Sequence, residues 1–114
     1  MKMVSITLDK ERVLKFGVKA FVEVEKALDI SMDEIDFERQ ETIYALLYAG
    51  LIHEDRKLTL DKVYDIVDGV IEKRAEEQGV GFMEVFGETL MYIGNKVGEA
   101  LGNKVDDEKP NDWW

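Results

Sequence analysis

His53 is the only histidine of the chain, and Glu54 and Asp55 follow it directly. An imidazole beside two carboxylates can bind a cation or transfer protons. A helical zinc motif needs a second histidine four residues along the chain, and the sequence has neither a second histidine nor any cysteine. We therefore expect no metal site, and we interpret His53 as a helix-ending residue that suits the negative end of the helix dipole.

Catalytic residues are also not evident from the spacing. No serine, histidine and aspartate set, activated lysine or glycine-rich phosphate loop can be assembled. Glu23 and Glu25 fall on nearly opposite faces of a helix, so they cannot work as a carboxylate pair, and Glu72, Glu76 and Glu77 resemble a solvated edge. We predict that the protein is not an enzyme and holds no cofactor.

Residues suited to protein contacts are concentrated toward the C-terminus. Soft and aromatic side chains occur at helical spacing there, as on adaptable binding surfaces, although core packing explains them equally well. They include Met83, Met91 and Tyr92. Two tryptophans end an acidic segment, which is either a docking motif or a tail that folds back or stays free. Our hypothesis assigns partner contacts to six residues: Phe82, Phe86, Leu90, Ile93, Trp113 and Trp114.

Three glycines recur in the same C-terminal region at intervals of four residues. Gly94, Gly98 and Gly102 would share one stripe of a helix and would let another backbone approach closely. A frayed terminal helix is the alternative interpretation.

Charge and segment length exclude several classes of function. The 114 residues carry a net charge of -10, which opposes binding to nucleic acid. The longest uncharged run covers residues 42–52. A helix needs about 20 apolar residues to span a bilayer, so this run is far too short. Asp9 interrupts the N-terminal apolar residues before a signal-peptide core could form. We expect a cytosolic protein that does not bind membranes.

Hydrophobic periodicity predicts a mainly α fold, a four-helix compact domain with a small N-terminal β-hairpin. We expect residues 1–102 to form a single domain and residues 103–114 to be an acidic, flexible tail. The expected strands cover residues 3–8 and 12–16, and the expected helices cover residues 18–28, 37–52, 60–78 and 82–101.

Local patterns refine these elements. In the first helix, the stripe that includes Val18 and Val22 is expected to face inward. The second helix is apolar on nearly every side, which predicts a central position in the core. Thr59 is expected to cap the third helix, and Gly79 to end it.

Three stretches of the sequence resemble the tail assembly chaperones of long-tailed phages and prophages. They are FGVKAFVEVEKAL at residues 16–28, ETIYALLYAGLIH at residues 41–53 and LTLDKVYDIVD at residues 58–68. The resemblance covers about residues 12–72, and it contains no chemically diagnostic residue.

The resemblance implies a small, mostly helical protein without catalytic activity. Such a chaperone coats the tape measure protein and helps tail tube protein to polymerise around it. It acts in the bacterial host cytoplasm and is absent from the finished particle, and the family is associated with a longer form made by frameshifting. We also expect a homo-oligomer.

Two other functions remain open at this point. One is a structural adaptor of the phage particle, such as a head-tail or tail component, which would stay in purified virions. The other is an acidic inhibitor that imitates nucleic acid. That function predicts a regular stripe of carboxylates, whereas acidic and basic residues alternate through the first 58 residues.

Overall fold

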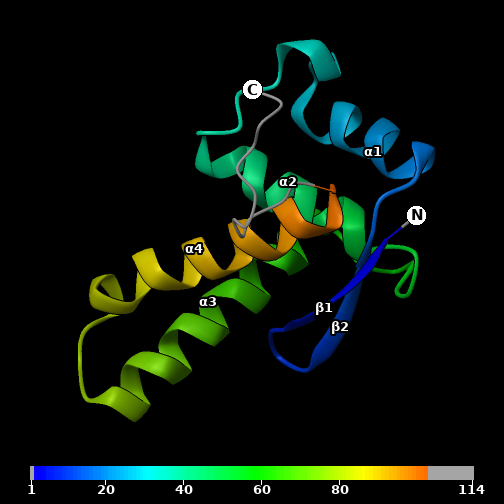
Figure 1. Ribbon diagram of the computed structural model, residues 1–114. Helices are drawn as coiled ribbons and strands as arrows, with labels where there is room; N and C mark the ends of the chain where they lie inside the picture. The colour runs from blue at the N-terminus through cyan, green and yellow to red at the C-terminus, as the bar shows by residue number, and fades with distance from the viewer. Residues whose placement is uncertain (1, 103–114) are drawn as a thin grey trace, which may run out of the picture.

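The computed structural model describes residues 2–102. This part of the chain contains four α-helices and an N-terminal antiparallel hairpin, which confirms the predicted fold class (Figure 1). The elements in chain order are β1 (Met3–Thr7), β2 (Glu11–Lys15), α1 (Val18–Leu28), the short 3-10 helix η1 (Met32–Glu34), α2 (Gln40–Leu51), α3 (Leu60–Gln78) and α4 (Phe82–Ala100). The predicted tail at residues 103–114 lies outside the described residues.

The hairpin places one face of each strand against the helices. Val4 pairs with Leu14 and Ile6 with Arg12, and the side chains of Val4, Ile6 and Leu14 are buried. Their neighbours on β1 are exposed, which is the alternation that the sequence predicts for a strand covered on one side.

The orientation of α1 differs from the prediction. Ala20 and Val24 are its buried residues, whereas Val18 is 83% exposed and Val22 is 43% exposed. Val18 and Val22 therefore do not face inward as expected, although Phe21 on the same stripe packs against the core. Ala20 and Val24 face the core on this side, so the other two valines remain on the outer surface.

The second helix begins later than expected. It starts at Gln40 rather than at residue 37, because Asp36 stabilises a turn just before it. The Asp36 carboxylate accepts a hydrogen bond from the Glu38 backbone at 3.0 Å, and the Asp36 carbonyl accepts one from Arg39 at 3.2 Å. Phe37 consequently lies outside the helix and is 56% exposed.

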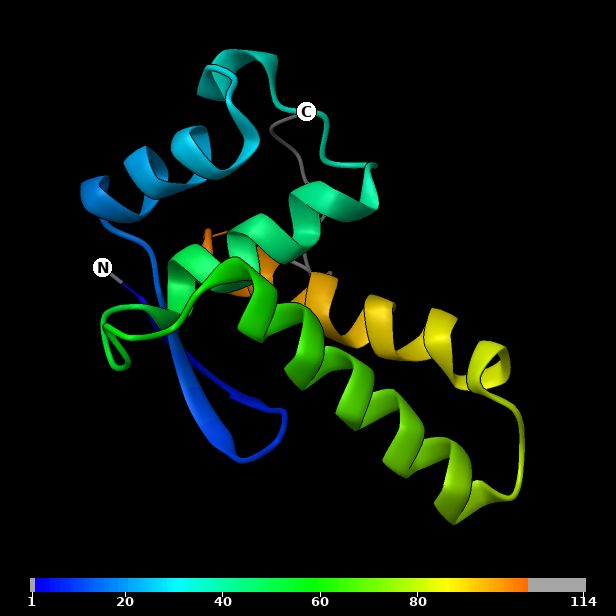
Figure 2. The same cartoon turned by 180° about the vertical axis from the view of Figure 1, so that it is seen from behind.

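Helix α2 is the centre of the core, as its composition predicts. It contacts α1, α3, α4 and β2, and most of its residues are buried. Gly50 lets α2 approach β2 and Phe16 closely, because a Cβ atom there would lie 2.8 Å from Leu14 Cδ2 and 2.8 Å from Phe16 Cζ, and those side chains would have to shift. Figures 1 and 2 show α2 crossing the pair formed by α3 and α4.

The boundaries of α3 follow the predicted signals. Thr59 caps its start, because the Thr59 hydroxyl accepts a hydrogen bond from the Lys62 backbone at 3.1 Å. Gly79 ends the helix in the left-handed conformation, with φ at 69°. A short connection then returns the chain, and α4 runs beside α3 in the opposite direction (Figure 2).

The His53, Glu54 and Asp55 segment attaches the loop after α2 to the hairpin. His53 Nε2 donates to the Val13 carbonyl at 2.7 Å, and the Glu54 carboxylate accepts from the Val13 backbone at 3.2 Å. Asp55 lies 3.8 Å from the Arg12 guanidinium. These three residues therefore connect the loop after α2 to the outer edge of β2.

The Arg12 and Asp9 pair predicts a specific loss of stability in acid. The nearly buried Arg12 guanidinium donates to both Asp9 carboxylate oxygens at 2.8 and 2.9 Å, and this contact lowers the pKa of Asp9 below its ordinary value of 3.8. Because the pKa of Asp9 is lower in the folded state, its carboxylate stabilises the fold at any pH above its unfolded-state pKa. That contribution disappears as the pH falls through the folded-state pKa.

We therefore expect the difference in unfolding free energy between the wild type and Asp9→Asn to be largest near neutral pH and to shrink below about pH 4. Urea unfolding of both proteins across this range measures the difference. A difference that stays constant with pH would contradict the assignment.

Candidate partner-binding surface

Helix α4 carries most of the residues that the sequence assigns to partner contacts. It begins after Gly81, whose backbone donates to the Glu84 carboxylate at 3.0 Å. One side of the helix faces the core and contacts α2, α3 and the hairpin. The buried residues of this side are Val85, Thr89, Ile93, Val97 and Ala100.

A second side of α4 is apolar and exposes two methionines. Within the described residues, Met83 is 73% exposed and Met91 is 69% exposed. At 3.6 residues per turn, the two methionines and four neighbouring positions fall within an arc of about 100° that has no charged residue. We call this arc the methionine face, and its members are Met83, Gly87, Leu90, Met91, Gly94 and Gly98.

Two glycines of the methionine face, Gly87 and Gly94, have few described atoms around them. A Cβ atom at Gly87 would meet no described atom within 4 Å, and one at Gly94 would meet only Ile43 Cδ1, at 4.0 Å. A neighbouring helix could therefore pack closely against the α4 backbone here. Gly102 does not join this stripe, because α4 ends at Ala100 and Gly102 has φ at 96°.

Phe82 and Phe86 lie on the side of α4 next to Leu90 and away from Met91. Phe82 is 38% exposed and stacks on half-buried Phe86, with the ring centroids 6.2 Å apart. Phe86 and Leu90 are partly buried against the core. These three residues keep accessible apolar surface, so a partner seated on the methionine face could contact them.

Ile93 requires a correction. Its side chain has 0% exposure, because it points into the core. The helical spacing places Ile93 near Phe82 and Phe86 on the wheel, but tertiary packing covers that part of the helix completely. In this fold Ile93 supports the helix from inside, and we remove it from the candidate partner surface.

Other predicted contacts fall elsewhere. Tyr92 does not lie on the methionine face, because its hydroxyl accepts a hydrogen bond from the Thr7 backbone at 3.0 Å and so attaches α4 to β1. Trp113 and Trp114 lie outside the described residues.

Thr89 is a weak point on the buried side of α4. Its side chain is 1% exposed, and among the described residues its hydroxyl is the one buried side-chain polar atom without a hydrogen-bond partner. Burying an unsatisfied hydroxyl costs about 1–3 kcal/mol.

We expect Thr89→Val to raise the free energy of unfolding by about 1 kcal/mol, because valine has nearly the same shape without the hydroxyl. Urea unfolding measures the change. Thr42→Val is the matched control, since Thr42 is 2% exposed and its hydroxyl does not share this defect. The explanation would be contradicted if both substitutions stabilised the protein equally, or if neither stabilised it.

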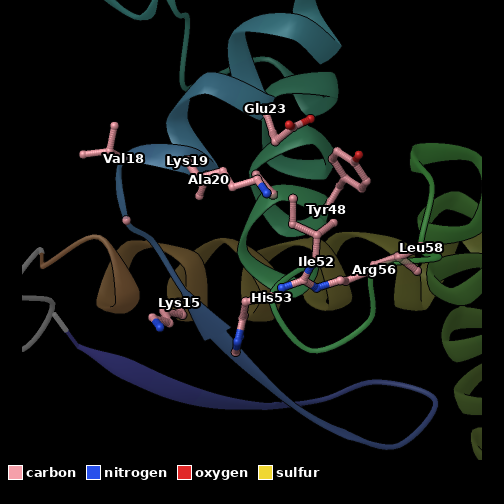
Figure 3. Close-up of a pocket in the computed structure, with 12 residues that line it drawn as sticks. Lys15, Val18, Lys19, Ala20, Glu23, Tyr48, Ile52, His53, Arg56 and Leu58 are labelled. Carbon is pink, nitrogen blue, oxygen red and sulfur yellow. The ribbon is translucent and has the colours of Figure 1, made fainter.

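A hollow between α1 and α2 was not predicted from the sequence. Its volume is about 730 Å³, and its lining comes from the end of β2, α1, α2 and the loop after α2 (Figure 3). Tyr48 stands at one end, where burial and then the nearby Glu23 carboxylate raise the pKa of its hydroxyl. Residues 15 and 56, both on the lining, are 41 positions apart, so no local pattern could indicate this site.

The described residues include no group of histidine and acidic side chains arranged to hold a metal ion. Among the helices of residues 2–102, none is long and apolar enough to cross a bilayer. Comparison with known protein families, curated proteins and solved structures finds no match to this chain.

Proposed function

We propose that the protein is a tail assembly chaperone of a long-tailed phage or prophage that binds the tape measure protein through the methionine face. One observation carries the proposal, namely the exposure of Met83 (73%) and Met91 (69%) on a helix face without charge. Contiguous exposed apolar surface of this kind is typical of protein association sites. The resemblance of residues 12–72 to tail assembly chaperones supports the choice of client.

The chemistry of the face suits a helical client. A tape measure protein of the kind the resemblance implies is long and helical, with apolar stripes that need cover before assembly. Methionine side chains adapt to different apolar partners, and the glycines let a client helix lie close to α4. The contact would be an amphipathic helix packed on an apolar surface.

The remaining features of the proposal concern solubility and location. The net charge of -10 would keep a complex with an apolar client in solution. We place the complex in the cytoplasm of the bacterial host, where several copies of the chain coat one client and recruit tail tube protein. The role includes no catalytic step.

Co-expression with the tape measure protein of the same genome tests this function. We expect the client to be soluble, and to co-purify with the chain, only when the chain is present. Client solubility that does not depend on the chain would overturn the proposal. Recovery of the chain from purified virions would instead indicate a structural component of the particle.

A further inference from the structure

The hollow between α1 and α2 has an apolar floor and a cationic rim. Ala20, Ala49 and Leu58 are nearly fully buried and line its interior. Because two of these residues are alanines, the helices meet without filling the space between them. The volume of about 730 Å³ lies in the range of about 300–1,000 Å³ that is usual for ligand sites.

The rim of the hollow is positive although the whole chain is acidic. Lys15, Lys19 and Arg56 line it, and within residues 2–102 none of them has a carboxylate oxygen within 4.0 Å. Glu23 is the acidic residue of the lining, and it already lies 3.8 Å from Lys26. Figure 3 shows the side chains of Lys15, Lys19, Arg56 and Glu23 among those that line the hollow.

An exposed apolar residue stands at the same opening. Val18 also lines the hollow and is 83% exposed, more than any other large hydrophobic side chain of the described residues. A ligand that covered Val18 and the alanine floor would remove apolar surface from water. The rim therefore favours a ligand that combines negative charge with an apolar group.

One segment of the chain has this combination. Residues 103–114 contain four acidic residues, Asp106, Asp107, Glu108 and Asp112, against two lysines, Lys104 and Lys109, and they include Trp113 and Trp114. The carboxylates complement the cationic rim, and an indole complements the apolar floor.

We infer that the hollow binds residues 103–114 of the same chain, with a tryptophan over Ala20 and Ala49 and the carboxylates facing Lys15, Lys19 and Arg56. Twelve extended residues reach up to about 40 Å, which compares with a longest dimension of 42 Å for the described part. Covalent attachment favours binding within one chain over binding between chains at low protein concentration. This inference does not depend on the proposed chaperone function.

Tryptophan fluorescence of the full chain tests the inference directly, because Trp113 and Trp114 are the only two tryptophans in the sequence. We expect emission at shorter wavelength than that of a peptide of residues 103–114. The combined Lys15→Glu, Lys19→Glu and Arg56→Glu variant should shift the emission to the wavelength of the free peptide. A variant with Gln at the same three positions should shift it part of the way.

The matched control reverses the same number of charges outside the hollow, at Lys10, Lys73 and Arg74. It should keep the wild-type emission, and circular dichroism would check that every variant is folded. Wild-type emission equal to that of the peptide would overturn the inference, as would an equal shift in the control. Emission that changes on dilution would also overturn it, because binding would then occur between chains.

Discussion

Ile93→Ala is expected to lower the free energy of unfolding by about 2–5 kcal/mol, the usual cost of removing several methyl and methylene groups from a packed core. Ile93 has 0% exposure and packs in the single core cluster formed by the helices and the hairpin. The truncated side chain would leave a cavity that the neighbouring helices cannot close fully.

Met91→Ala is the matched control on the same helix, two residues away. Met91 is 69% exposed, so its truncation should change the free energy of unfolding by no more than about 0.5 kcal/mol. Urea unfolding of both variants measures the contrast. If both variants lost the same free energy of unfolding, Ile93 and Met91 would not lie on a buried side and an exposed side of α4.

The combined Met83→Asp and Met91→Asp variant is expected to lose client binding almost completely. Each substitution would put an unpaired carboxylate into an apolar contact, which costs several kcal/mol when the partner binds. A loss of about 3 kcal/mol corresponds to an affinity lower by about a hundredfold. Because both side chains are mostly exposed in the free protein, the stability of the chain itself should change little.

The control variant replaces two exposed apolar residues outside α4 with aspartate. Val22 and Phe37 are 43% and 56% exposed and lie outside α4, so Val22→Asp with Phe37→Asp should retain the client. Co-purification from cells that express both proteins compares the two variants. Loss of the client in both would mean that general surface hydrophobicity, rather than the methionine face, retains it.

Local signals account for the parts of the fold that the sequence predicted. The Thr59 cap, the Gly79 stop and the alternation along β1 each depend on interactions within a few residues. The apolar composition of α2 predicted its central position, because a helix without a polar face is stable only when other elements bury nearly all of its sides.

Features that depend on distant contacts could not be predicted in the same way. Val18 and Val22 fit an inward stripe by spacing, but α1 turns small Ala20 toward α2 instead. Ile93 fits the stripe of Phe86 and Leu90, but the position of the neighbouring elements decides how much of that stripe is covered. Periodicity identifies an apolar side of a helix and does not say whether the chain itself covers it.

The candidate sites also differ in whether local signals or contacts between distant residues define them. The sequence marks Met83 and Met91 only as adaptable side chains, outside the six residues assigned to partner contacts, and the structure adds that both are exposed. The attachment of His53 to Val13 joins residues 40 positions apart, and the hollow joins α1 to the loop after α2. No sequence pattern marks such pairs, because they arise only when the elements pack.

Methyl NMR of the methionines tests the central claim most directly, because the chain contains five methionines and they report on different surfaces. The complex of the full chain with a soluble tape measure fragment would be compared with the free chain. We predict that the Met83 and Met91 methyl signals move or broaden, while those of Met3 on the hairpin and Met32 on η1 stay in place. Unchanged Met83 and Met91 signals in a complex that has formed would contradict the account.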